Sequence, residues 1–191
     1  MGDRFIRWYR ESGNIPAFSQ QAAAFARCGI TIRNPSTGSA TVINVDGDDV
    51  PVDIDALAGL LALRVPSVSV NWWISPNINV VSEFTHEPLG CEIQTFWLDG
   101  LDFTEIGVVE AAITHAMENV PTQTRALVGD IHGITDAGDW DSFVLYEGSE
   151  IPGVVDSLIL ESELAGRVIS SSAPLRKESV GEGYLTRISA G

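Results

Sequence analysis

Three consecutive segments with strand periodicity constrain the fold of this 191-residue chain more than any other feature of its sequence. Apolar and polar residues alternate from Val68 to Ile74, from Ile78 to Phe84 and from Glu92 to Leu98. A period of two residues is typical of strands that bury one face. Turn residues separate the first two segments at 75–77. The pattern predicts a three-stranded antiparallel meander.

A long helix is predicted from Asp102 to about Asn119. Asp102 and Glu105 have the spacing of a capping box, in which the aspartate accepts a bond from the helix start and the glutamate reaches back. Apolar residues then recur at helical spacing, whereas Glu110, Thr114 and Glu118 face away from that stripe. Pro121 ends the helix.

The other elements are predicted from composition and spacing. They are short helices over 5–9 and from Pro16 to Ala26, a hairpin of 30–33 with 40–45, a helix capped by Asp53 or Asp55, a hairpin of 126–134 with 142–146, and strands over 154–160, 166–169 and 183–188. Runs of strands interrupted by a few helices favour the α+β class. We therefore expect one domain over residues 1–191, mainly an antiparallel sheet with a few helices packed on one side.

The net charge of −15 is distributed unevenly. Residues 65–166 hold seventeen Asp and Glu and a single base, Arg125, whereas the flanking segments are close to neutral. Nucleic-acid backbones and anionic membranes are bound through Lys and Arg, so repulsion opposes both as partners of the acidic segment. A basic protein or a cation would be attracted.

The sequence indicates a cytoplasmic protein. Charged residues interrupt the first ten positions, where a secretory signal needs an apolar run, and the most apolar window, 54–63, is too short to cross a bilayer. The two cysteines, Cys28 and Cys91, are too few for a disulfide framework, and Cys91 is expected to be a small buried hydrophobe.

The segment Val128–Asp141 has the residues most suited to chemistry, with four aspartates and one of three histidines. Its start, Gly129–Gly133, resembles the first metal-binding block of calcineurin-like metallophosphoesterases, in which an aspartate and a histidine two residues later bind a dinuclear metal centre. The resemblance covers five residues. The Asn-His pair and later histidines of that family do not occur after His132.

A mononuclear site for a divalent metal makes fewer demands on the sequence. Its ligands would be Asp130, His132, Asp136, Asp139 and Asp141, and His86 or His115 could join them. The alternative is a polar turn between two strands, for which Asp and Gly need no metal. A divalent metal is thus possible, although no cofactor is required by the sequence.

Other candidate sites have weaker signals. His115 and Glu118 lie three residues apart and would form either an acid–base pair or a solvated helix face. No glycine-rich phosphate loop occurs, because Gly181 and Gly183 lack a third glycine and a following helix. Nucleotide binding therefore has no support in the sequence.

The alternative function of the acidic segment is to bind a protein. Trp73 is expected on the strand face opposite Trp72, either exposed or covered by the N-terminal helices. The residues considered for contact with a partner are Trp73, Glu83, Asp139, Trp140 and Asp141.

The leading hypothesis is a non-enzymatic, acidic cytoplasmic interaction protein, similar in action to immunity or antitoxin proteins that inhibit a basic partner. Carboxylate-rich surfaces of such inhibitors meet cationic sites and speed association. The alternatives are a metal-dependent, phosphoesterase-like hydrolase using Asp130 and His132, and a structural or phage-particle subunit.

Overall fold

The fold was obtained as a computed structural model, which describes residues 2–12, 15–87, 90–146, 148, 150–171, 175–180 and 184–190. Within these residues the helices are α1 (Ile15–Arg27), α2 (Ile54–Ala62), α3 (Phe103–Asn119), α4 (Asp139–Leu145) and α5 (Ser162–Ser171). The strands are β1 (Phe5–Glu11), β2 (Ala40–Ile43), β3 (Asp49–Val52), β4 (Ser67–Ser75), β5 (Ile78–His86), β6 (Cys91–Trp97), β7 (Thr124–Asp130), β8 (Ser157–Glu161), β9 (Leu175–Val180) and β10 (Leu185–Ala190).

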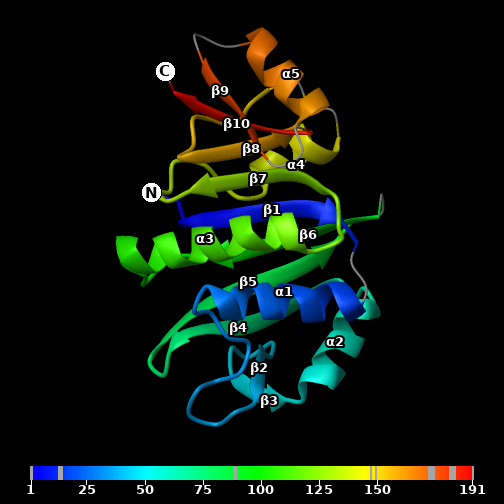
Figure 1. Cartoon of the computed structure of the whole chain (residues 1–191), viewed down its shortest axis with the longest axis vertical. Coiled ribbons are helices and arrows are strands. Elements are labelled where there is room, and N and C mark those ends of the chain that lie inside the picture. Colours follow the sequence, from blue (N-terminus) through cyan, green and yellow to red (C-terminus); the bar gives the residue numbers. More distant parts are fainter. Residues whose placement is uncertain are drawn as a thin grey trace.

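All ten strands belong to one sheet, in the order β3-β2-β4-β5-β6-β1-β7-β8-β10-β9, and every neighbouring pair is antiparallel (Figure 1). The N-terminal strand β1 lies in the interior of this sheet, between β6 and β7. The predicted α+β class, a single domain with helices packed against an antiparallel sheet, is confirmed.

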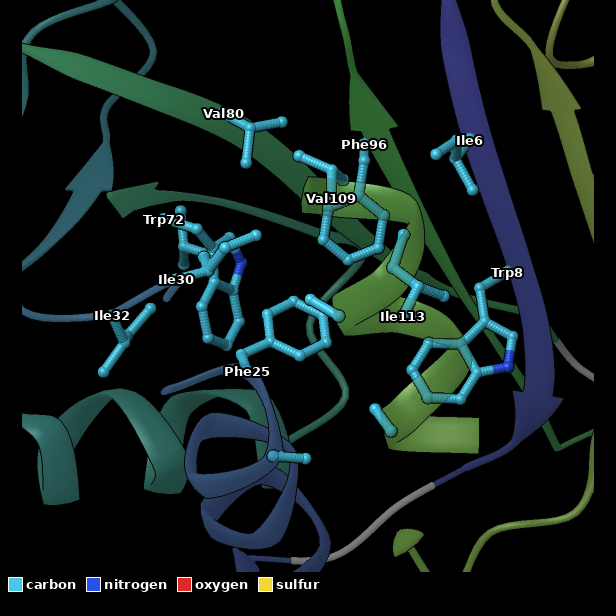
Figure 2. Close-up of a cluster of buried hydrophobic side chains, with 14 of the residues drawn as sticks. Ile6, Trp8, Phe25, Ile30, Ile32, Trp72, Val80, Phe96, Val109 and Ile113 are labelled. Atoms are coloured by element: carbon cyan, nitrogen blue, oxygen red, sulfur yellow. The ribbon is translucent and has the colours of Figure 1, made fainter. Parts of the chain in front are cut away.

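The larger core lies between one face of the sheet and helices α1, α2 and α3. Figure 2 shows Phe25 of α1 inserted among side chains from the sheet and from α3. Its ring centroid is 4.7 Å from that of Trp72 and 5.8 Å from that of Phe96. Val109 and Ile113 of α3 complete this packing and are fully buried. Burial of these large side chains is the main stabilisation of this half of the fold.

The second core covers the other face of the sheet, where α4 and α5 pack against the strands around β7, so the helices lie on both faces and not on one side as expected. Strand β1 contributes to both cores, because Phe5 and Tyr9 belong to the second and Ile6 and Trp8 to the first. A central strand buried on both faces has a nearly continuous apolar sequence. This is why the prediction of a helix over 5–9 was wrong.

A buried polar cluster joins α1 to the sheet. The guanidinium of Arg10 donates to Glu92 at 2.7 Å and to Gln21 at 2.8 Å, and it lies over the ring of Trp8 at 4.1 Å. Gln21 also donates to Gln94 at 2.8 Å. Arg10 offsets part of the cost of burying this ion pair through its contacts with Gln21, Gln94 and the Trp8 ring, although its Nη1 has no hydrogen-bond partner.

The structure confirms the meander as β4, β5 and β6, and it confirms both helix caps. Asp53 caps α2, and Asp102 forms the expected capping box with Glu105. Strand β7 confirms the first part of the strand predicted over 126–134, but it ends at Asp130. Helix α4 follows it in place of the strand predicted over 142–146. Residues 166–169 likewise lie in helix α5 instead of a strand.

The predicted hairpin of 30–33 with 40–45 was wrong in its pairing. Strand β2 pairs with β3 and β4, whereas Thr31 forms only an isolated bridge with Trp73. In the described part of the chain, no helix combines the length and apolar character needed to span a membrane.

Candidate functional site

The aspartate at the end of β7 is an internal hydrogen-bond acceptor that fixes the loop after it. Asp130 is fully buried, and one carboxylate oxygen accepts bonds from the backbone N–H groups of Ile134 at 2.8 Å and Thr135 at 2.6 Å and from the Thr135 hydroxyl at 2.9 Å. The other oxygen accepts from the backbone of His132 at 3.2 Å. An aspartate bonding to backbone groups a few residues on is a turn-forming arrangement.

Burial alone would raise the pKa of Asp130, but the four hydrogen bonds favour the ionised form and bring the pKa below its usual value. The carboxylate is therefore charged and occupied by protein donors. Within the described residues, no group of three or more His, Cys, Asp or Glu side chains is placed to hold a metal ion. The five candidate ligands of the Asp-rich segment are thus not brought together.

His132 points away from Asp130. Its Nδ1 lies 2.8 Å from one oxygen of Asp156, and the second oxygen of Asp156 accepts from the backbone of Ile131 at 2.8 Å. The His132 side chain is 56% exposed. Asp156 therefore orients the imidazole and links the β7 loop to the start of β8, and the ring stays open to solvent.

The remaining residues of the Asp-rich segment belong to α4 or the loop before it. Trp140 is fully buried against the sheet and donates to the Thr135 hydroxyl at 3.0 Å, so it offers no surface to a partner in this fold. Asp141 forms a two-point ion pair with Arg7, at 2.9 and 2.8 Å from Nη2, and accepts from the Tyr9 hydroxyl at 2.8 Å. Asp136 and Asp139 are exposed.

The other residues considered for partner binding lie apart from α4. Trp73 on β4 is only 8% exposed, which supports the covered alternative for this side chain. Glu83 on β5 is half-buried and accepts from the Ser67 hydroxyl at 2.7 Å. Cys91 is buried as expected, and burial raises the pKa of its thiol to about 11. His86 ends β5 beside Glu92, which pairs with Arg10 at the end of β1 opposite to the end that pairs with Asp130.

Titratable side chains come together in a groove along α3, and not in the Asp-rich segment. Its volume is about 780 Å³, within the range of sites that bind ligands. Helix α3 forms one wall, and β7, β8 and β10 form the other side; its polar lining residues are Glu110, Thr114, His115, Glu118, Asp156, Ser157 and Arg187. Glu110 and Glu118 on the α3 wall thus lie opposite Asp156 and Arg187 on the strand wall of an open groove.

The surroundings of Glu110 in this groove raise the pKa of its carboxyl group. Burial raises its pKa; Arg187 acts in the opposite direction, and Asp156 raises the pKa further. A carboxylate with a raised pKa in a groove is a common feature of functional sites. A cation placed beside Glu110 and Asp156 would relieve this repulsion and favour the ionised glutamate.

His115 and Glu118 both line the groove, as a solvated helix face would allow. The ring of His115 has Asn119 as a neighbour, with Nδ1 to Nδ2 at 3.3 Å.

A second, mainly apolar cavity of about 700 Å³ adjoins the groove along α3, with Thr114 and Glu118 lining both. Its apolar lining includes Met117, Val120, Val180, Tyr184 and Leu185. We name these two adjoining cavities the channel along α3; the first is lined by carboxylates and the second mainly by apolar residues.

Glu110, Asp156 and Arg187 were not predicted as site residues from the sequence. A signal for one wall was present, since the polar stripe of Glu110, Thr114 and Glu118 on α3 is the stripe that faces the groove. The opposite wall comes from strands far along the chain, and its position depends on the order of strands in the sheet.

Comparisons with models of known protein families, with curated proteins and with solved structures find no match to this chain.

Proposed function

We propose that this chain is a non-enzymatic, acidic interaction protein of the cytoplasm that binds a basic protein partner through the groove along α3. The proposal rests on one observation, which is that some carboxylates of the acidic segment are bound by internal donors and others line the groove. Asp130 and Asp141 are satisfied by internal donors, whereas Glu110 and Glu118 line an open groove opposite Arg187. Asp156 also lines this groove, although its oxygens contact His132 and the backbone of Ile131. Such a lining attracts Lys and Arg side chains and speeds their association.

The channel also suits a protein segment better than an isolated cation. Helix α3 has 17 residues, which gives a length of about 25 Å at 1.5 Å per residue. An extended peptide rises about 3.3 Å per residue, so roughly seven or eight residues can lie along this helix. Basic side chains would occupy the acidic end, and apolar side chains would occupy the end formed by Met117, Val180 and Leu185.

The hydrolase remains the alternative, and one observation favours it. Asp156 orients His132 at 2.8 Å beside the groove, as a carboxylate orients a general base. The dinuclear metal chemistry of the phosphoesterase resemblance would need Asp130 to bind metal, but its oxygens accept four bonds from the protein. Loss of a hydrolytic activity in His132→Ala, with the fold intact, would support the alternative.

The test is calorimetric titration of the protein with an arginine-rich peptide that ends in leucines, at low and at physiological salt. The reversed-charge peptide, with glutamates in place of arginines, is the ligand control. We expect the cationic peptide to bind, and we expect its affinity to fall as salt rises, because the attraction is between exposed charges. Absence of binding at low salt, or equal binding of both peptides, would contradict the proposed function.

Two triple variants of equal net charge show whether the groove is responsible. The groove variant combines Glu110→Gln, Glu118→Gln and Asp156→Asn. The control variant combines Asp46→Asn, Asp48→Asn and Glu163→Gln, which change exposed positions outside the groove. We expect the groove variant alone to lose about tenfold or more in affinity. Equal losses in both variants would show that only net charge matters.

A further inference from the structure

Three strongly exposed apolar side chains belong to segments that meet where β7 ends and α3 begins. Phe103 is 68% exposed, Ile134 64% and Val154 74%. The ring centroid of Phe103 lies 6.4 Å from that of His132, two residues before Ile134. Figure 1 shows the arrowhead of β7, the start of α3 and the N-terminus at the same edge of the molecule. We name Phe103, His132, Ile134 and Val154 the β7-edge patch.

Val154 belongs to this patch because the segment that carries it is fixed to the β7 loop on both sides. Asp156 bonds to the backbone of Ile131 and to the ring of His132. On the other side, a Cβ built on Gly153 would lie 2.8 Å from the Thr135 side chain. The patch is therefore formed by three segments distant in sequence: the start of α3, the β7 loop and the approach to β8.

Hydrogen bonds fix the backbone that carries the patch. The Asp130 carboxylate fixes the backbone of residues 132–135, and the capping box of Asp102 and Glu105 fixes the helix turn that carries Phe103. Apolar side chains on a fixed backbone lose little conformational freedom when a partner covers them. Clustered exposed apolar side chains rimmed by polar residues are typical of protein-binding surfaces.

The rim of the patch is acidic. Asp102 and Asp136 are exposed within the same segments, and Asp3 follows Gly2, whose N–H bonds to Gly133 of the β7 loop at 3.0 Å. The nearest described base in the N-terminal segment, Arg4, is paired with Asp99 at 3.3 Å. Asp156 belongs both to this rim and to the groove along α3.

We infer that the β7-edge patch is the anchoring point for the basic protein partner. An apolar side chain of the partner contacts Phe103, Ile134 and Val154, while its lysines or arginines face the surrounding carboxylates and the mouth of the groove. An apolar centre with a charged rim is the usual arrangement of a protein interface. The inference rests on the proposed function and adds the location and apolar character of the contact.

The test is amide chemical-shift mapping of the ¹⁵N-labelled protein with a short peptide in which tryptophan and leucine are flanked on both sides by pairs of arginines. We expect the largest shifts at residues 102–105, 131–136 and 154–156. We also expect Phe103→Ala combined with Ile134→Ala to weaken binding by about tenfold or more. The matched control truncates two apolar side chains elsewhere that are at least as exposed, Val45→Ala and Leu63→Ala, and should leave the affinity unchanged.

The outcomes separate the inference from the proposed function. If the peptide binds but shifts only residues 114–123, or if the Phe103 and Ile134 variant binds as well as the control, the anchoring inference is wrong and the groove proposal stands. If the peptide does not bind at low salt, the proposed function itself fails. The amide spectrum of each variant also reports whether its fold is unchanged.

Discussion

Replacing Asp130 by alanine is expected to destabilise the fold by about 3–5 kcal/mol. The carboxylate is fully buried and accepts three backbone bonds and one hydroxyl bond, which alanine cannot replace. A hydrogen bond to a charged group contributes about 1.5–3 kcal/mol, and an unsatisfied buried donor costs about 1–3 kcal/mol. The sum overestimates the loss, since Ile134 is exposed and water can reach part of the released loop.

The assay is urea denaturation followed by circular dichroism, with thermal unfolding as a second measurement. A loss of this size corresponds to a fall in Tm of roughly 10 °C for a chain of this length. Asp130→Asn is the control, because its amide oxygen retains part of the acceptor capacity; we expect it to cost about 1–2 kcal/mol. Destabilisation by Asp130→Ala of less than about 1 kcal/mol would refute the structural role assigned to this carboxylate.

The pH dependence of stability gives the same test a second readout. The pKa of Asp130 is lower in the folded protein than in the unfolded chain. Its contribution is therefore present above the unfolded pKa of about 4 and is lost as the pH falls through the folded pKa. Asp130→Asn should remove this part of the acid-side decrease in stability. An unchanged acid transition would contradict the assignment.

Three further changes test other parts of the account. Asp141→Ala should cost about 2–4 kcal/mol in urea unfolding, because it leaves the guanidinium of Arg7 without its two-point partner; a neutral effect would show that the ion pair adds nothing. Trp140→Ala should cost about 3–5 kcal/mol, since the side chain is fully buried, and a stable variant would contradict its packing against the sheet. The affinity for the cationic peptide should rise as the pH increases through the raised pKa of Glu110, because a cation prefers the ionised glutamate. Glu110→Gln should flatten this part of the dependence of affinity on pH.

The elements that could be predicted from sequence were those with local signals. The meander follows from residue alternation between Val68 and Leu98, and α3 follows from its capping box and apolar stripe. Strand β1 was misinterpreted because burial on both faces removes the alternation. Helix α4 was missed because its seven residues are too few for a clear period, and its stability comes from Trp140 and Asp141 packing on the sheet.

The candidate site was harder to predict because its walls are distant in sequence. The Asp-rich segment resembled a set of metal ligands, but Asp130 accepts hydrogen bonds from the loop that follows it and Asp141 accepts them from Arg7 and Tyr9 of β1. Asp156 and Arg187 carry no motif, and they meet the polar face of α3 only because β8 and β10 follow β7 in the sheet. Strand order of this kind is set by long-range packing, which residue periodicity does not encode.

Thermal unfolding with either metal ions or the cationic peptide compares the two functions most directly. A ligand that binds only the folded state at a hundredfold excess over its Kd adds about 2.7 kcal/mol, or several degrees in Tm. The account predicts that the arginine-rich peptide raises the Tm of the wild type, less so for the groove variant, and that Mn²⁺, Zn²⁺, Mg²⁺ and Ca²⁺ leave the Tm at its value in EDTA. A rise with one of these metals that is lost in His132→Ala, with no rise for the peptide, would contradict it.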